Sequence, residues 1–268
     1  MRRSRIAAYV GSVLLTVGLV LTGTAAAQAA PSAATGGYVA LGDSYSSGVG
    51  AGSYISSSGD CDRSTKAYPY LWNAANHPSS FSFTACSGAR TDDVLAGQLG
   101  PLNSGTSLVS ISIGGNDAGF SDVMTTCVLQ SDSNCLSRIA TARAYVDSTL
   151  PGKLDNLYSV IRGKAPSARV VVIGYPRFYK LGQTCLGLSE AKRSAINDAA
   201  DRIDTVIAKA AANHGFVFGD VRTTFSGHEI CSGNSWLHSV DWLDIGDSYH
   251  PTASGHSGGY LPVLNSAA

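Results

Sequence analysis

The sequence predicts a single α/β domain in which a parallel β-sheet carries helices on both faces. Short β-favouring runs alternate with longer helical segments, which is the pattern of successive strand–helix–strand units. Two of the runs, 109–113 and 170–173, lean toward continuous apolar sequence, as strands buried on both faces do. After residue 35 there is no repeat, low-complexity linker or run of charge, so we expect one domain over residues 35–268.

Five runs are expected to form strands. They cover residues 38–42, 81–85, 108–113, 169–174 and 216–218. The segments expected to be helical are 67–76, 92–99, 136–162 and 189–213. The last helix has the clearest signals, because Ser189 can cap its start, Ile196, Ile203, Val206 and Ile207 mark one face, and Gly215 follows its end.

Three of the expected strands end in residues that can carry chemistry. The first ends at Gly42-Asp43-Ser44, the second at Cys86-Ser87-Gly88 and the third at Gly114-Gly115-Asn116-Asp117. In open α/β sheets, ligands bind in the crevice beyond the carboxyl ends of the strands. We therefore expect these three strand ends to converge on one site.

Composition and charge narrow the classes of function. Of the 268 residues, 44% are hydrophobic and only 14% are charged, which suits a globular chain with a sizeable core. The 19 Lys and Arg residues balance 19 Asp and Glu residues and form no basic block. Nothing therefore predicts a nucleic-acid partner.

The first 34 residues have the parts of a secretory signal peptide. Arg2, Arg3 and Arg5 precede an apolar stretch over 6–21, and residues 22–34 are small and polar. Small-residue sites ending at Ala29 and Ala34 predict cleavage near 29–34 and a secreted, extracellular protein. The alternative is an uncleaved membrane anchor, because the apolar stretch is nearly long enough to span a bilayer.

All six cysteines follow that segment, at Cys61, Cys86, Cys127, Cys135, Cys185 and Cys231. An even number in an exported chain indicates disulfides. The competing interpretation is a zinc site, but no C-x2-C pair supports it. Many connectivities are open, and we favour the most local one, with pairs 61–86, 127–135 and 185–231, because short loops close most easily.

One serine and one histidine stand in settings that indicate nucleophilic catalysis. A serine hydroxyl is a weak nucleophile until a base takes its proton, and the base needs a partner that holds its tautomer. Ser44 follows the first strand, and His250 lies three residues after Asp247 and directly before Pro251. Pro251 favours an extended backbone at His250, so Asp247 could reach Nδ1 and leave Nε2 facing the site. Ordinary solvated turns also carry such sequences.

The other histidines and a metal site are the alternatives to this pairing. Four histidines stand at helix ends or in a polar loop, where surface and capping side chains are common: His77, His214, His228 and His238. Four residues recur every three positions: Asp241, Asp244, Asp247 and His250. An extended loop would scatter these ligands, and no calcium-loop pattern is present. We expect no metal.

The second and third strand ends could supply an oxyanion hole, which needs hydrogen-bond donors fixed where negative charge develops. Gly88 lacks a Cβ, so its backbone N–H can approach a substrate closely. Asn116 offers a side-chain amide, and the N–H of Ser44 would be the third donor. Cys86, two residues before Gly88, would tether that loop through a disulfide.

Taken together, these blocks resemble the SGNH (GDSL) hydrolase superfamily. The superfamily has four blocks, which carry Ser, Gly, Asn and His in this order; here they are GDS at 42–44, Gly88, GGND at 114–117 and DSYH at 247–250. The longer stretches VALGDSYSSGVGAGSY, TACSGART, VSISIGGNDAGF and SYHPTASG are similar to secreted actinobacterial GDSL lipases. The layout of six cysteines, with disulfides between sequential neighbours, is similar too.

The resemblance spans essentially all of the chain after the leader. It implies a three-layer α/β/α fold around a five-stranded, flavodoxin-like parallel sheet, and chemistry that needs no cofactor. It implies that Ser44 is the nucleophile, His250 the base, and Ser44, Gly88 and Asn116 the oxyanion hole. Asp247 is the expected orienting acid, although some close relatives use a backbone carbonyl, here that of Ser248. Asp43 is expected to hold the turn.

The resemblance also implies an extracellular carboxylic-ester hydrolase, a monomer that acts on triacylglycerols and also on phospholipids, without stable membrane insertion once the leader is removed. The alternatives are a carbohydrate O-acetyl esterase and an exported binding module on the same scaffold. The small residues after Ser44 predict an open cleft without a lid. Five apolar residues could line an acyl groove or equally belong to the core: Phe120, Tyr179, Leu181, Trp236 and Leu237.

Overall fold

The computed structural model describes residues 36–242 and 246–268. In this part of the chain, five parallel strands form one sheet in the order β2-β1-β3-β4-β5. The strands are β1 (Gly37–Gly42), β2 (Ser80–Phe83), β3 (Thr106–Ser112), β4 (Arg169–Ile173) and β5 (Val217–Gly219). This is the flavodoxin-like order, and the prediction of that sheet is confirmed.

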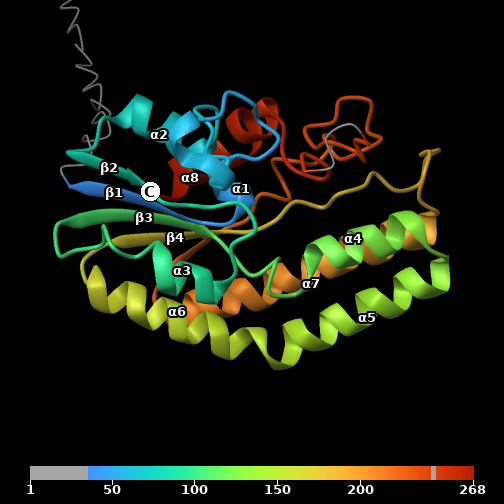
Figure 1. Ribbon diagram of the computed structural model, residues 1–268, viewed down its shortest axis with the longest axis horizontal. Coiled ribbons are helices and arrows are strands. Elements are labelled where there is room, and N and C mark those ends of the chain that lie inside the picture. The colour runs from blue at the N-terminus through green and yellow to red at the C-terminus, as the bar shows by residue number, and fades with distance from the viewer. Residues whose placement is uncertain (1–35, 243–245) are drawn as a thin grey trace, which may run out of the picture. The chain divides into compact units, whose positions relative to one another are not determined.

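Helices cover both faces of the sheet, which confirms the predicted three layers. Figure 1 shows α2 (Tyr68–Asn76) and α8 (Leu261–Ala267) on one side of the sheet. The other side carries α3 (Thr91–Gly97), α6 (Leu150–Lys164) and α7 (Glu190–Asn213). Two further helices pack together and extend beyond the carboxyl edge of the strands beside α7: α4 (Phe120–Leu129) and α5 (Asp132–Ser148).

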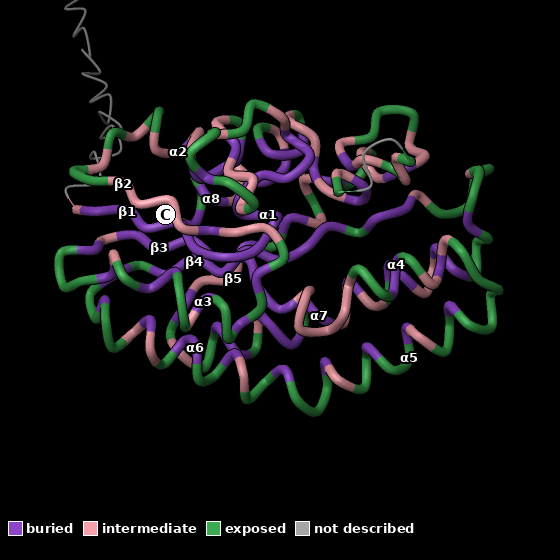
Figure 2. The backbone as a smooth tube through the Cα atoms, in the orientation of Figure 1, coloured by how far each residue is buried: buried purple, intermediate pink, exposed green. Residues whose placement is uncertain are grey.

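The central strands are buried on both faces. Every residue of β1 is buried, and β3 and β4 are nearly so, as the purple tube of Figure 2 shows. The hydroxyl of Tyr38 on β1 is buried, but it hydrogen-bonds to Ser110 Oγ on β3 at 2.7 Å. A buried polar group that is paired in this way costs little. The sheet can therefore serve as a rigid base for the loops at its ends.

One predicted helix is wrong, because residues 136–162 form parts of two helices. Helix α5 ends at Ser148 and α6 begins at Leu150, with Thr149 between them. Pro151 lies in the first turn of α6, where its missing N–H costs nothing, whereas inside a continuous helix its ring would clash with the preceding turn. The helix predicted from Ser189 does begin there, since the Ser189 hydroxyl accepts a hydrogen bond from the N–H of Lys192.

Strands β1 and β3 are neighbours, but the chain leaves them toward opposite edges of the sheet. After β1 the chain forms β2 on one side, and after β3 it forms β4 on the other. Such a topological switch point is where open α/β sheets bind ligands. The short helix α1 (Ser44–Ser47) follows β1 at this point, and Asn116 follows β3.

The predicted signal peptide lies outside the described residues. Within them, no helix is both long enough and apolar enough to cross a membrane.

Candidate active site

The backbone before Ser44 turns at Gly42, where the neighbouring groups leave no room for a side chain. Gly42 adopts φ +124°, and a Cβ at this position would collide with the Ser112 carbonyl. The Gln98 side chain clamps the same glycine, accepting from its N–H at 2.7 Å and donating to its carbonyl at 2.8 Å. The chain therefore leaves β1 in one direction, with Ser44 as the first residue of α1.

Asp43 holds the turn, as expected. Its carboxylate accepts hydrogen bonds from the Tyr45 N–H at 3.0 Å, the Ser112 hydroxyl at 2.7 Å and the Tyr175 hydroxyl at 2.5 Å. Burial raises the pKa of Asp43 to about 6, although these donors act against the rise. The Tyr175 hydroxyl also accepts from the Gly115 N–H at 3.1 Å, so it ties the nucleophile turn to the loop that carries Asn116.

The structure brings the two residues singled out by the sequence together. His250 Nε2 lies 2.8 Å from Ser44 Oγ. Tyr249 adopts φ +68°, a left-handed conformation that is uncommon for a residue with a side chain and that turns the chain into His250. Its carbonyl accepts a hydrogen bond from the Tyr45 hydroxyl at 2.7 Å. The residue after Ser44 thus holds the residue before His250.

His238 supports the same loop through its backbone. Its N–H donates to the His250 carbonyl, and its carbonyl accepts from the Tyr249 N–H, both at 3.0 Å. Its ring Nε2 lies 2.8 Å from the Gly50 carbonyl. No signal in the sequence indicates this role, because the backbone pairing between 238 and 249–250 depends on the fold.

The Asp247 carboxylate does not reach the imidazole of His250. Among the described residues, no hydrogen bond or ion pair joins this carboxylate to the imidazole. The N–H of His250 donates to the backbone carbonyl of Asp247 at 3.1 Å, and Asp247 Oδ1 accepts from the Tyr54 hydroxyl at 3.0 Å. The carbonyl of Ser248 is the main polar group near the imidazole that favours its charged form, followed by that of Gly246. Nδ1 is buried and has no hydrogen-bond partner among the described residues. The polar surroundings of the ring therefore favour the carbonyl of Ser248 over the carboxylate of Asp247.

Burial keeps His250 neutral. It lowers the pKa of the imidazole from 6.5 to about 4, while the nearby carbonyls act in the opposite direction. A neutral imidazole has an acceptor nitrogen, and Nε2 faces the Ser44 hydroxyl. The pair is therefore in the protonation state needed for Ser44 to give its proton to His250.

The three residues expected to form an oxyanion hole line one cavity beside His250. The N–H groups of Ser44 and Gly88 have no acceptor in the described part of the chain. Gly88 adopts φ +74°, and a Cβ there would meet open space. Asn116 Nδ2 donates one hydrogen to the Ala89 carbonyl at 3.1 Å, which leaves its second hydrogen free for another acceptor.

The structure contains three disulfides, which join the six cysteines as sequential neighbours: Cys61–Cys86, Cys127–Cys135 and Cys185–Cys231. The first lies beside the loop of Gly88, where the Ser87 N–H also donates to the Cys61 carbonyl at 3.1 Å. The loop that carries Gly88 is thus tethered by a covalent bond and a backbone hydrogen bond.

Two cavities meet at Ser44. The inner channel has a volume of about 80 Å³ and runs between α4, α5 and α7; its deep lining includes Val123, Ala142, Val146, Ile196, Ala200 and Ile203. The outer groove is larger, at about 460 Å³, and contains His250 and Gly88. Both cavities share Ser44, Asn116, Phe120 and Met124.

Of the five apolar residues expected to line an acyl groove or the core, only Phe120 lines these cavities. Tyr179 and Leu237 are buried in the core, Trp236 packs against it, and Leu181 is 38% exposed. The residues of the inner channel were missed, because apolar and small side chains on α5 and α7 have the same spacing as ordinary core positions.

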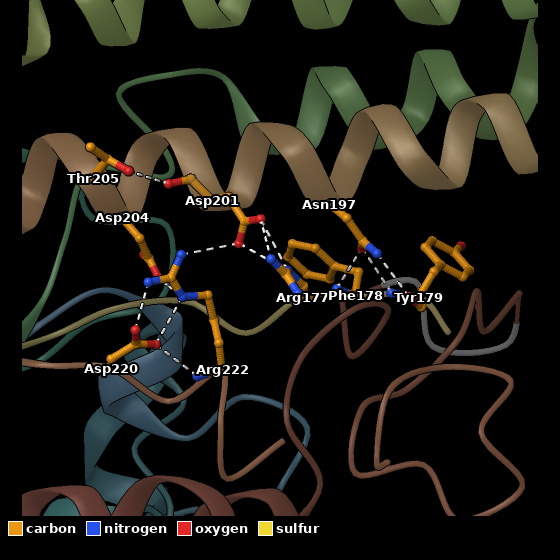
Figure 3. A network of polar contacts seen from close by, with 9 residues as sticks. All are labelled: Arg177, Phe178, Tyr179, Asn197, Asp201, Asp204, Thr205, Asp220 and Arg222. Carbon is orange, nitrogen blue, oxygen red and sulfur yellow. Dashed lines mark hydrogen bonds and ion pairs between the residues drawn. The ribbon is translucent and has the colours of Figure 1, made fainter. Parts of the chain in front are cut away.

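One wall of the inner channel is held by a polar network that Figure 3 shows. The chain after β4 is fastened to α7 by the Asn197 side chain, which binds the backbone of Phe178 and Tyr179. Arg177 pairs with Asp201 at 2.7 Å. Arg222 pairs with the same carboxylate and with two further acids, Asp204 and Asp220. Phe178 and α7 are therefore fixed relative to each other.

Three other histidines make contacts elsewhere in the structure. His77 ends α2, His214 lies 2.8 Å from an Asp155 oxygen, and His228 stacks on Trp236. Among the described residues, no group of three or more His, Cys, Asp or Glu side chains could hold a metal ion. Asp244 lies outside the described residues.

Comparison with known proteins places this site in context. The model of the GDSL-like lipase/acylhydrolase family matches residues 40–257. Lipase 1 of Streptomyces coelicolor is 75% identical over 268 residues, which is the full length of both chains. A lipase of Streptomyces rimosus is 66% identical over the full length of both chains.

Two solved structures are also similar. Phospholipase A1 from Streptomyces albidoflavus NA297 has 70% sequence identity and a TM-score of 0.87, over 88% of this chain and 100% of that one. The extracellular lipase of Streptomyces rimosus has 68% identity and a TM-score of 0.85, over 87% of this chain and 100% of that one.

Proposed function

Because the chain belongs to the GDSL-like lipase/acylhydrolase family, we propose that it is an extracellular serine ester hydrolase that cleaves fatty-acyl esters such as triacylglycerols. The observation that carries the proposal is the 2.8 Å contact between Ser44 Oγ and His250 Nε2 at the mouth of an apolar channel. The high identity to proteins named lipases supports the substrate class.

In the first half-reaction Ser44 Oγ attacks the ester carbonyl while His250 Nε2 takes its proton. The imidazolium that forms is stabilised by the Ser248 carbonyl, the main polar group near the ring that favours its charged form. Negative charge on the carbonyl oxygen is received by the N–H groups of Ser44 and Gly88 and by the free amide hydrogen of Asn116.

The tetrahedral intermediate then collapses, and His250 gives its proton to the departing alcohol. An acyl group remains on Ser44. In the second half-reaction His250 takes a proton from water while the water oxygen attacks the carbonyl carbon of the acyl-enzyme. The same oxyanion hole stabilises the tetrahedral intermediate. The fatty acid leaves, and Ser44 regains its proton.

Phospholipids are the second substrate class that we propose, because the chain is 70% identical to phospholipase A1 of Streptomyces albidoflavus. A carbohydrate O-acetyl esterase is disfavoured, since an acetyl group would leave the apolar channel empty. Secretion follows from the predicted leader together with the similarity to an extracellular lipase. We propose that the mature enzyme acts as a monomer.

The test compares hydrolysis of acetyl, octanoyl and hexadecanoyl esters of one alcohol by secreted wild-type protein and by Ser44→Ala. We expect the wild type to hydrolyse the two longer esters well and the variant to be inactive on all three. Turnover of acetyl esters alone would overturn the lipid assignment. Full activity of Ser44→Ala would overturn the assignment of the nucleophile.

A further inference from the structure

We propose that the two cavities at Ser44 divide the substrate, with the acyl chain in the inner channel and the alcohol part in the outer groove, and that Ala142 and Ala200 set the length of acyl chain that fits. This inference rests on the proposed function. It adds to it the direction in which an ester lies across the site and the residues that select the acyl group.

The direction follows from where the proton must go. The departing alkoxide takes its proton from His250 Nε2, so the alcohol part lies on the His250 side of Ser44. His250 lines the outer groove and does not line the inner channel. The acyl chain leaves the carbonyl carbon on the other side, where the inner channel begins.

Phe120 lines both cavities where they meet at Ser44. Its ring makes an edge contact with His250 at 6.5 Å between centroids and stacks on Phe178, a residue of the channel wall, at 5.6 Å. The ring therefore contacts both the base and a wall of the channel. An ester at Ser44 would have its acyl and alcohol parts on the two sides of Phe120.

The chemistry of the two cavities agrees with this direction. The inner channel is lined mostly by apolar side chains and is small, about 80 Å³. A single unbranched chain suits such a space, whereas a glycerol carrying further chains does not. The outer groove is larger, about 460 Å³, and includes polar residues such as Ser87, Ser121 and Thr125.

Two alanines keep the channel open. Ala142 on α5 and Ala200 on α7 are both buried and line it. Neighbouring positions carry larger side chains, Val146 and Ile196, so space exists where the alanines stand. The network of Figure 3 fastens α7 to the chain after β4, so the wall that carries Ala200 resists the movement that would relieve a larger side chain.

The test is a series in which Ala142 becomes Val, Leu and Phe, assayed with p-nitrophenyl esters from acetyl to hexadecanoyl. We expect kcat/KM for acetyl and butanoyl esters to stay within about twofold of wild type. For longer chains we expect a loss of about fourfold for each methylene that no longer fits. The larger the side chain at position 142, from Val through Leu to Phe, the shorter the acyl chain at which the loss of kcat/KM begins. Ala200→Val gives an independent variant of the facing wall.

Ala144→Phe is the matched control, because Ala144 lies two residues further on α5 and is exposed. It leaves the acyl-length profile unchanged. Thr125→Phe lies in the outer groove and lowers activity on the butanoate ester of dodecanol more than on that of ethanol, without changing the acyl profile.

An unchanged profile in folded Ala142→Phe, or an equal loss at every chain length through the graded series, would overturn the inference. If Thr125→Phe instead shortened the acyl chain that is accepted, and Ala142→Phe acted on the alcohol part, the ester would lie across the site in the opposite direction. That result would overturn the inference. Inactivity of wild type on every acyl ester would refute the proposed function instead, so the two failures are distinguishable.

Discussion

The nucleophile turn and the histidine loop meet at one 2.8 Å contact, but they are held in different ways. Buried side chains from three other parts of the chain hold Asp43 and Gly42: Gln98, Ser112 and Tyr175. The loop before His250 is held by backbone pairing with His238 and by the hydroxyls of three tyrosines: Tyr45, Tyr54 and Tyr179. The nucleophile is thus built into the sheet, whereas the base depends on the course of a loop.

This difference separates two carboxylates that look alike in the sequence. Asp43 precedes Ser44 and is fully buried under three donors, although it does not touch His250. Asp247 has the spacing of an orienting acid, but it is partly exposed and bonded to Tyr54. We therefore expect changes around Asp43 to have large effects and changes at Asp247 to have small ones.

The largest effect is expected at the contact itself. Ser44→Ala and His250→Ala each lower kcat by about 10⁴-fold or more, and the double variant is no worse than either, because residues that act as one unit are not additive. Steady-state kinetics on an octanoyl ester, with folding checked by circular dichroism, measures this. Additive losses would show that the two residues do not act together.

The pH dependence tests the environment of the base. Neutral His250 is the active form, and burial lowers its pKa to about 4. We expect kcat/KM to be level from pH 7 to about 5 and then to fall about tenfold per pH unit below 4. An acid limb centred near 6.5 would contradict the buried, neutral imidazole. Burial raises the pKa of Asp43 to about 6, so Asp43 could also produce an inflection in the pH profile. The variant Asp43→Asn distinguishes the two groups, because it removes an inflection that belongs to Asp43.

An intermediate effect is expected on the nucleophile side at Tyr175. Tyr175→Phe removes the hydroxyl that joins Asp43 to the Gly115 N–H, so two buried groups lose a partner at a cost of about 1–3 kcal/mol of stability. Through Asn116 it lowers kcat by roughly tenfold with little change in KM. Tyr158→Phe is the control, because the Tyr158 hydroxyl is buried without a partner, and it leaves both quantities unchanged.

The smallest effect is expected at Asp247. Asp247→Asn lowers kcat by less than about threefold, because its carboxylate does not contact the imidazole. In a serine hydrolase that uses an aspartate to orient its histidine, the same change costs about 10⁴-fold. A loss of that size here would restore Asp247 as the orienting acid.

The parallel sheet and four site residues could be predicted from the sequence, because strand ends and short motifs are local features. These residues are Ser44, Gly88, Asn116 and His250. The sequence did not predict the break between α5 and α6, although Pro151 marks it. The supports of the site were also missed. Tyr175 and Gln98 act across 132 and 56 residues of chain, and such partners are set by sheet order and not by spacing.

The central claim is that Ser44, activated by His250, forms the acyl-enzyme. Its most direct test is labelling of the secreted enzyme with a long-chain alkyl fluorophosphonate, followed by mass analysis of peptides. The account predicts one label, on the peptide that contains Ser44, and no label in His250→Ala at the same exposure. A label on another residue, or equal labelling of His250→Ala, would contradict it.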